Sequence, residues 1–345
     1  MGPEVAALSC SWVELGLGIH KNAQLLWRIF MTLGSCASSQ VKSMGLLNHL
    51  RGILLTAIFS ITISMVAVPA VFFALVKLLL PVPALRRAID RLLDAISNLW
   101  IIFNTWQQTY TLPTQVDVDG LGDLSRDEWY MLVANHQSWT DILVLVRAFN
   151  ARIPGVKFFF KQSLLWVPVL GLALWGLDFP YMRRYSKAKL ARHPELKGKD
   201  VEQTRKACER FRHHPVTIIN FMEGTRFTPG KHQQQQSPYR HLLMPRAGGL
   251  AFTLAAMDGQ LHRLLDVTIL YPEGIPTYWD YACGRVKQIK VHIHQRSIPA
   301  ELIGDYTEDA QFRAQFQQWV NELWRQKDEQ IELMKQEYMK KAPKN

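Results

Sequence analysis

Short apolar runs alternate with helical patterns from Pro113 onward, and this alternation sets the fold that we expect. Five runs have the length and the β-branched or aromatic content of strands. We predict these strands at residues 129–134, 156–160, 216–222, 265–271 and 286–294. Apolar residues at helical spacing predict helices at residues 138–149, 162–176, 200–213, 248–257 and 308–338. The alternation predicts an α/β fold, a mixed sheet flanked by helices.

An apolar segment without charged residues precedes this domain. It runs from Gly52 to Val76, which is long enough for a helix that crosses a membrane, and Pro69 is expected to kink it. Arg51 stands before the segment, whereas Lys77 and three arginines follow it. The preference for positive charge on the cytoplasmic side therefore predicts an inner (plasma) membrane protein whose domain faces the cytoplasm. The alternative is a hairpin or interfacial helix that enters the bilayer without crossing it.

The segments around the membrane helix and the α/β domain complete the expected organisation. An amphipathic helix is expected at residues 84–110, after the membrane helix. We divide the chain into an N-terminal extension, a membrane segment with its amphipathic helix, an α/β domain and a charged, frayed tail, at residues 1–43, 44–110, 111–325 and 326–345. A second reading of the extension is that Met44 is the true start.

Two shorter segments of the domain carry expectations of their own. Residues 164–180 are apolar and rich in Trp and Pro, which suits either an interfacial, chain-binding segment or a buried core helix. Gln233 to Gln236 form a low-complexity run that we expect to be a loop.

Composition narrows the classes of partner. The 345 residues are 48% hydrophobic, and 40 basic against 29 acidic residues give a net charge of +11. This charge suits anionic lipids and acyl-donor phosphates; the basic residues are spread along the chain without a nucleic-acid-binding motif, so no nucleic acid is expected. Four widely separated cysteines favour a reducing compartment over disulfides. His292 and His294 lack a matching carboxylate, and we expect no metal.

The sequence from Asn135 to Asp141, Asn-His-Gln-Ser-Trp-Thr-Asp, follows the first predicted strand of the domain. A hydroxyl needs a base to take its proton as it attacks an acyl carbon, and a neutral histidine serves this purpose. A carboxylate that fixes the tautomer makes such a histidine more effective. His136 with Asp141 in the first turn of the next helix fits this chemistry. The alternative is a helix entry at which Asp141 offsets the helix dipole and His136 only packs.

The sequence Glu-Gly-Thr-Arg, from Glu223 to Arg226, follows another predicted strand. It predicts a tight turn at Gly224 that presents a hydroxyl and a guanidinium, and the guanidinium fork suits a phosphate monoester. Arg183 and Arg184 lie between the two blocks. The alternative is a surface turn with a Glu–Arg ion pair, which contributes little to stability.

Four blocks in this order resemble the motifs of lysophospholipid (1-acylglycerol-3-phosphate) acyltransferases, a glycerolipid acyltransferase family. Residues 135–141 resemble the first motif, and residues 175–184 stand where the family has its Gly-to-Arg acceptor motif. Residues 221–228 and 265–272 resemble the third and fourth motifs. The resemblance extends from about residue 50 to about residue 325.

The blocks depart from the family pattern at two positions. Met222 stands where many members have Pro, and the fourth block lacks the Pro that many members carry. The sequences of the fourth block and of residues 243–246 are more similar to a branch that includes acyltransferases for other lysophospholipid head groups. The identity of the acceptor is therefore left open, whereas the reaction is not.

The resemblance implies a reaction and a role for each matching residue. It implies His136 as base with Asp141 as its partner, and an acceptor-phosphate site formed by Arg183, Glu223, Gly224, Thr225 and Arg226. It implies acyl transfer from acyl-CoA or acyl carrier protein to 1-acylglycerol-3-phosphate, giving phosphatidic acid in phospholipid biosynthesis, without metal or organic cofactor. The alternatives are another lysophospholipid acceptor, in remodelling, or a membrane lipid-binding protein without catalysis.

Overall fold

The computed structural model describes residues 45–341, with gaps at residues 81, 168–169, 178 and 183–201 and at scattered positions between 203 and 213. The predicted extension at residues 1–43 therefore lies outside the described residues. So does most of the helix predicted at residues 200–213.

A six-stranded mixed sheet forms the centre of the domain. It contains the five predicted strands and one strand, at residues 115–119, that was not predicted. Its strands follow the order β1-β8-β7-β2-β6-β3. Their bounds are Gln115–Asp119 for β1, Gln288–Ser297 for β8, Arg263–Leu270 for β7, Tyr130–Ala134 for β2, Thr217–Phe221 for β6 and Val156–Phe158 for β3. All neighbours are parallel except β7 and β8. The carboxyl ends of β2, β6 and β7 therefore meet at one edge of the sheet.

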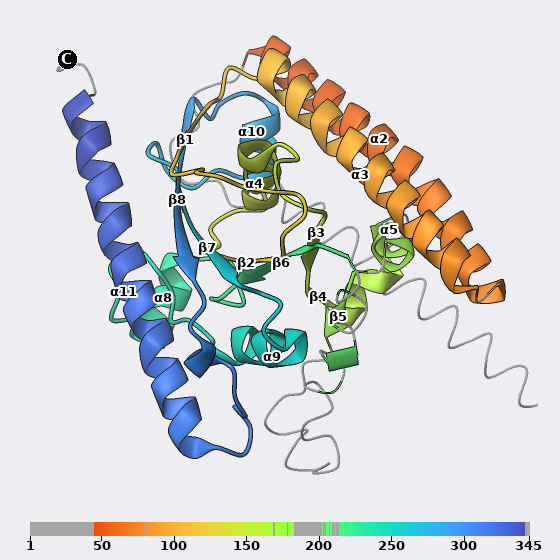
Figure 1. The fold of residues 1–345 in the computed structure, drawn as a ribbon. Helices are drawn as coiled ribbons and strands as arrows, with labels where there is room; N and C mark the ends of the chain where they lie inside the picture. The colour runs from red at the N-terminus through yellow and green to blue at the C-terminus, as the bar shows by residue number, and fades with distance from the viewer. Residues whose placement is uncertain are drawn as a thin grey trace, which may run out of the picture.

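Helices cover both faces of this sheet (Figure 1). Their bounds are Asp141–Phe149 for α4, Leu170–Gly176 for α5, Pro229–Gln235 for α8, Gly248–Met257 for α9, Tyr278–Ala282 for α10 and Ala310–Lys341 for α11. Short 3-10 turns occupy Gln162–Trp166 and Ala300–Leu302, and Phe160–Lys161 (β4) pairs with Tyr181–Met182 (β5) in a two-stranded sheet. The helix predicted at residues 162–176 is thus a 3-10 turn and a short helix.

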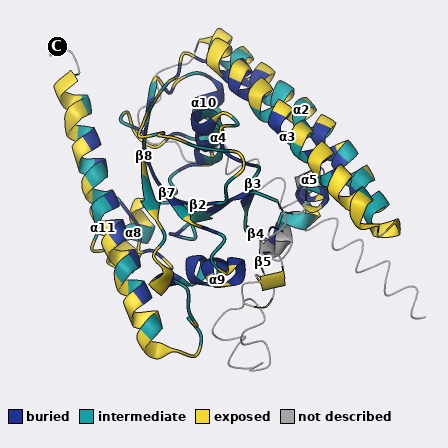
Figure 2. Ribbon diagram, viewed as in Figure 1, coloured by how far each residue is buried: buried dark blue, intermediate teal, exposed yellow. Residues whose placement is uncertain are grey.

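Neighbouring residues of the central strands β2, β6 and β7 supply two separate cores. Met131 and Val133 of β2 pack into one cluster, which includes α9 and α11. Tyr130 and Leu132 pack into the other, which includes Leu145 of α4. Side chains of successive strand residues point to opposite faces, so a strand with helices on both faces is apolar throughout. All five residues of β2 are buried, as the uninterrupted apolar run indicates (Figure 2).

Two long helices, α2 (Leu46–Leu79) and α3 (Pro83–Thr111), form an antiparallel hairpin along one side of the domain (Figure 1). Trp100 Nε1 donates to Thr62 Oγ1 at 3.2 Å, and Lys77 pairs with Asp90 at 3.0 Å. Pro69 lies inside α2, which continues through it. Among the described residues, α2 is the one helix long and apolar enough to cross a membrane.

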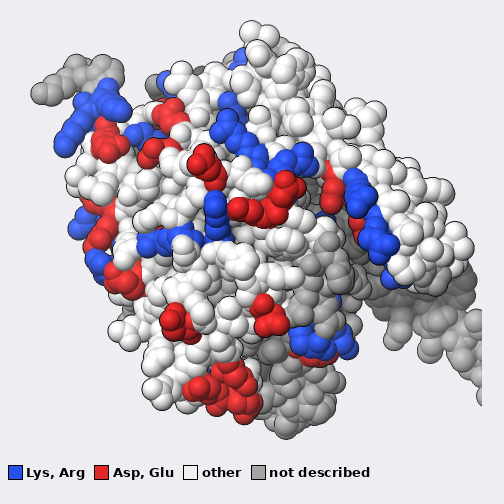
Figure 3. Space-filling model, in the orientation of Figure 1, with Lys and Arg blue, Asp and Glu red and all other residues white. Residues whose placement is uncertain are grey.

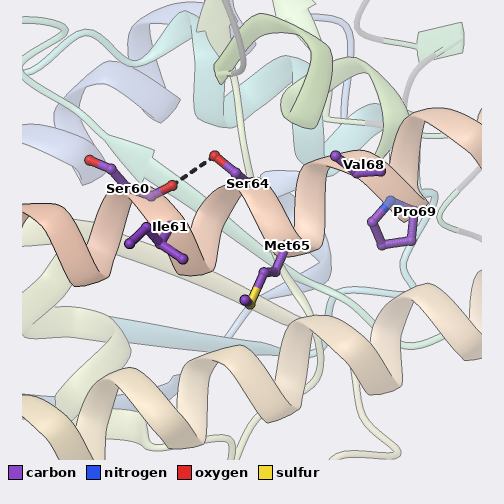
Figure 4. A pocket seen from close by; sticks show the side chains of 6 residues that line it. All are labelled: Ser60, Ile61, Ser64, Met65, Val68 and Pro69. Carbon is purple, nitrogen blue, oxygen red and sulfur yellow. Dashed lines mark hydrogen bonds between the residues drawn. The ribbon is translucent and has the colours of Figure 1, made fainter.

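The outer surface of the hairpin is apolar. Exposed residues of α2 and α3 include Leu47, Leu54, Ile61, Met65, Phe72, Leu99, Phe103 and Trp106. On the face seen in Figure 3, most of the hairpin surface carries no charged side chain. A shallow groove on α2 is lined by Ser60, Ile61, Ser64, Met65, Val68 and Pro69, where the Ser64 hydroxyl donates to the Ser60 carbonyl at 2.7 Å (Figure 4). The segment expected at residues 164–180 is mixed, because Trp166 and Trp175 are exposed whereas Leu174 is buried.

Two expectations for polar segments are wrong. Gln233 to Gln235 belong to the helix α8 and not to a loop. This helix begins at Pro229, and the Thr228 hydroxyl caps it by accepting the Lys231 backbone N–H at 3.3 Å. The described part of the tail, residues 326–341, is not frayed, because α11 continues to Lys341. The helix predicted at residues 308–338 agrees with this. A buried seam holds this part of the helix against the domain; it consists of Lys327, Ile331 and Met334.

Lys327 explains why a charged segment packs. Its side chain is fully buried, and its ammonium donates to the Asp266 carboxylate and, at 2.6 Å, to the carbonyl of Val267. Burial lowers the pKa of Lys327, although the Asp266 carboxylate acts in the opposite direction. A charge-to-charge pair of this kind anchors α11 to β7 only while both partners are present.

Replacing Lys327 by Met should therefore destabilise the protein. The buried Asp266 carboxylate would lose its main cation, for which we expect a loss of about 3–5 kcal/mol in the free energy of unfolding. Urea unfolding in detergent measures this loss, with Lys340→Met on the exposed face of α11 as the control. Equal stability of the two variants would contradict the anchoring role.

Candidate active site

His136 and Asp141 meet at the carboxyl end of β2. His136 Nδ1 lies 2.8 Å from Asp141 Oδ2, and the Asp141 side chain is fully buried. The same oxygen accepts the backbone N–H groups of Gln137 at 2.6 Å and Ser138 at 2.9 Å. A carboxylate at Nδ1 favours the tautomer whose Nε2 carries the lone pair. The pair therefore has the geometry of a base and its orienting carboxylate.

Tyr271, the residue after β7, supplies a further donor to Asp141. Its hydroxyl donates to Asp141 Oδ1 at 2.6 Å. Complete burial, reinforced by the nearby Asp141 charge, raises the pKa of Tyr271 well above its ordinary value, so the phenol keeps its proton. Sequence analysis assigned no role to Tyr271, although it belongs to the fourth block.

Asn135 joins β2 to β7 beyond the last residue of β2. Its side-chain amide donates to the Ile269 carbonyl at 2.9 Å, and its side-chain oxygen accepts the Ile269 N–H at 2.8 Å. The side chain thereby replaces a backbone pair of the sheet at the point where the chain turns toward His136. This explains the need for an amide at the first position of the block.

The His136 ring is held by packing and remains accessible. It stacks on Phe221, the last residue of β6, with ring centroids 4.2 Å apart. The His136 carbonyl accepts the Phe227 N–H at 2.7 Å. The side chain is 18% exposed, so a substrate can approach it.

Glu223 lies beneath the site rather than in it. Its fully buried carboxyl group accepts the backbone N–H of His136 at 3.1 Å and of Leu243 at 3.3 Å. Burial raises the pKa of Glu223 to about 8, against the two N–H donors that lower it. The expectation that Glu223 contacts the acceptor phosphate does not fit this position, because the carboxyl group faces backbone amides of the protein.

The rest of the second block lies nearer the surface. Gly224 forms the expected tight turn with a φ of 66°, in the left-handed region that favours glycine. The Thr225 hydroxyl accepts from Lys231 at 2.7 Å. The Arg226 guanidinium lies over the Trp139 ring, 4.8 Å from its centroid. These three residues are half-buried.

The predicted Arg183 and Arg184 and the expected absence of a metal are considered last. Arg183 and Arg184 lie outside the described residues. Within the part of the chain that the structure describes, no three His, Cys, Asp or Glu side chains converge as metal ligands would.

Comparisons with known proteins identify the family that this domain resembles. Residues 115–274 match the model of the Acyltransferase family. The chain is 25% identical over 245 residues to the 2-acyl-1-lysophosphatidylinositol acyltransferase of Saccharomyces cerevisiae, covering 58% of this chain and 60% of that protein. It is 25% identical over 255 residues to the mouse 1-acyl-sn-glycerol-3-phosphate acyltransferase gamma, covering 70% and 62%. The chain thus spans about three fifths of the length of these relatives.

A solved structure is also similar to the chain. It is the 1-acyl-sn-glycerophosphate acyltransferase PlsC of Thermotoga maritima, with 21% sequence identity and a TM-score of 0.46, covering 83% of this chain and 98% of that one.

The raised pKa of Glu223 predicts how stability changes with pH. Because its folded-state pKa of about 8 lies above its ordinary 4.5, the folded protein holds a proton that the unfolded chain releases. The contribution of Glu223 to stability is full below about pH 4.5 and is lost as pH rises to about 8, by at most about 1.4 kcal/mol per unit.

The variant Glu223→Gln should lack this part of the pH dependence. Urea unfolding between pH 5 and pH 8 measures the slope for the wild type and the variant. The exposed Glu301→Gln is the matched control, for which we expect the wild-type slope. An unchanged slope in Glu223→Gln would contradict the buried, protonated state of Glu223.

Proposed function

Residues 115–274 form a domain of the Acyltransferase family, and we propose that it moves a fatty acyl group from a thioester to 1-acylglycerol-3-phosphate. The product is phosphatidic acid, and the donor is acyl-CoA or acyl carrier protein. The observation that carries this proposal is the contact between His136 Nδ1 and the buried Asp141 carboxylate.

The reaction follows from the position of His136. Its Nε2 takes the proton of the acceptor hydroxyl as the hydroxyl oxygen attacks the thioester carbonyl carbon, and the new ester forms as the carbon–sulfur bond breaks. The proton then passes from the imidazolium to the departing thiolate. Asp141 stabilises the imidazolium between these two steps.

The acceptor head group is bound beside this base. Arg226 and Thr225 lie on the turn that follows β6, and the carbonyl of His136 accepts the N–H of Phe227 on the same segment. We propose that Arg226 and Thr225, together with Arg183, bind the acceptor phosphate. Glu223 and Gly224 instead shape the backbone that presents them.

A second acceptor class has support from the comparisons. The yeast relative is named for lysophosphatidylinositol, whereas the mouse relative is named for 1-acylglycerol-3-phosphate. A phosphodiester acceptor would use the same base and the same reaction. The acceptor panel below separates the two.

The contacts of α2 favour the hairpin alternative for membrane association. An added Cβ at Gly52 would lie 2.6 Å from Cys283 Sγ, and one at Gly176 of α5 would lie 2.7 Å from the Ala70 carbonyl carbon. Gly52 and Ala70 are separated by about 27 Å along a helix, close to the thickness of a bilayer core. A helix held by the domain over this length does not also cross the bilayer.

We propose that the hairpin of α2 and α3 lies in one leaflet through its outer apolar surface. The leaflet assigned is the cytoplasmic leaflet of the plasma membrane, because arginines are gathered near the start of α3, at Arg86, Arg87 and Arg91. The catalytic domain then meets lysophospholipid and membrane lipids at the surface where they reside.

Replacing His136 by Ala should lower turnover at least about 100-fold, because the general base is lost. Thiol release from an acyl thioester measures turnover on detergent-solubilised protein. The acceptor panel contains 1-oleoylglycerol-3-phosphate, lysophosphatidylinositol, lysocardiolipin and lysophosphatidylglycerol. Wild-type turnover by the variant would contradict the assignment of the base.

The same panel, with wild-type protein, identifies the acceptor. Preference for 1-oleoylglycerol-3-phosphate is the expected result. Activity on a phosphodiester alone would instead indicate a function in phospholipid remodelling. Binding of lysolipid without turnover of any acceptor would instead support a lipid-binding protein.

Labelling of Gly45→Cys, at the start of α2, tests the hairpin. Protein with Cys10 and Cys36 replaced by Ser is placed in sealed vesicles whose domain faces outward, and a membrane-impermeant maleimide is added. We expect Gly45→Cys to react from the same side as the domain control Lys287→Cys. Protection of Gly45→Cys until the vesicles are opened would show a crossing helix.

A further inference from the structure

Lys231 lies in the first turn of α8, which begins after the second block, and neither the motifs nor the comparisons give it a role. Its ammonium donates to the Thr225 hydroxyl oxygen at 2.7 Å and to the Arg226 carbonyl at 2.9 Å. The Lys231 side chain thus reaches back over the Glu-Gly-Thr-Arg turn.

The fold fixes Lys231 in this position. The Thr228 hydroxyl caps α8 by accepting the Lys231 backbone N–H, and Pro229 occupies the first turn with its preset φ. Only Phe227 lies between Arg226 and the cap, which is too short a connection to let α8 move independently of Arg226. Lys231 is therefore placed by the backbone as well as by its own hydrogen bonds.

We propose that Lys231 is the second cation of the acceptor-phosphate subsite and a positioning residue for Thr225. The proposal rests on the function proposed above and names the acceptor class of that site as phosphate monoesters. The ligand is recognised by its charge: a phosphate monoester carries about −1.5 to −2 at neutral pH, whereas a lysolipid phosphodiester carries a single charge on its phosphate.

The hydrogen bond from Lys231 determines what Thr225 can do. A hydroxyl has one proton and two lone pairs, and here one lone pair accepts from the ammonium. The hydroxyl proton is then directed away from Lys231, toward an anion at the turn. An oxygen of such an anion, at about 2.7 Å from Thr225 Oγ1, would lie within about 5.4 Å of the Lys231 charge.

Trp139 gives the subsite its other side. The Arg226 guanidinium lies over the Trp139 ring at 4.8 Å, which fixes the plane of its fork. Trp139 belongs to the same turn as His136. The contact with Trp139 therefore fixes the position of the Arg226 guanidinium relative to the His136 ring. Arg226 and Lys231 together match a dianion better than a monoanion, because Coulomb attraction scales with the ligand charge.

The test compares acceptors in Lys231→Gln. For 1-oleoylglycerol-3-phosphate we expect KM to rise about tenfold or more with kcat changed less than about threefold, because a charge-assisted hydrogen-bond donor and a charge are lost. For lysophosphatidylglycerol the rise in KM should stay below about threefold. Lys231→Arg, which keeps the charge, should recover most of the affinity. Lys287→Gln removes the same charge from an exposed site on another part of the surface and should leave both acceptors unchanged.

A second measurement separates this proposal from the proposed function and from misfolding. Dissociation constants for the same two lysolipids are measured in a His136→Ala background, which needs no turnover, with thermal unfolding of each variant as a check of the fold. Thr225→Val and Lys231→Gln are combined in a double-mutant cycle. We expect their effects on monoester affinity to be non-additive, because one acts through the other.

Three results have distinct meanings. Weaker monoester binding in Lys231→Gln, with binding of the diester retained, supports the subsite even if no acceptor is turned over. A second result is that the wild-type protein is active and Lys231→Gln loses affinity equally for both lysolipids, or for neither. This result overturns the role of Lys231 and leaves the proposed function standing. Additive effects of Lys231 and Thr225 overturn the positioning role. If Lys231→Gln does not fold, Lys231→Met and Thr225→Val decide the same points.

Discussion

The buried carboxylate of Asp141 is the group on which the geometry of the site depends. It accepts hydrogen bonds from His136, from the backbone of Gln137 and Ser138, and from the Tyr271 hydroxyl. A buried carboxylate is costly unless such donors surround it. The turn after β2, the start of α4 and the end of β7 are therefore held together by the same group that orients the His136 ring.

A second buried carboxyl group carries this support to the C-terminal helix. Glu223 accepts from the backbone of His136 and Leu243, and the Leu243 carbonyl accepts from Trp324 of α11 at 3.0 Å. Lys327, one turn further along α11, is anchored to Asp266 of β7. A helix remote from the chemistry thereby fixes the backbone of the histidine.

Five of the six strands of the sheet and the two blocks could be predicted because long apolar runs and turn residues are local signals. The strand β1 was missed because its residues alternate between polar and apolar and are partly exposed. The direction of a buried carboxyl group is not local, which is why Glu223 was assigned to the acceptor rather than to the backbone beneath His136. Tyr271 was missed for the same reason, since its partner Asp141 lies 130 residues away. The charged residues at the end of α11 led to the expectation of a frayed tail. Lys327 is buried there because its ammonium pairs with the Asp266 carboxylate, which lies far away in the sequence.

Single-turnover acyl transfer by Asp141→Asn tests the central claim most directly, that Asp141 makes His136 an effective base. The asparagine amide keeps the volume of the side chain but cannot stabilise an imidazolium as a carboxylate does. The account predicts a fall in the transfer rate of at least about 100-fold, with lysolipid affinity and the circular dichroism spectrum preserved. Transfer at the wild-type rate in a folded variant would contradict it.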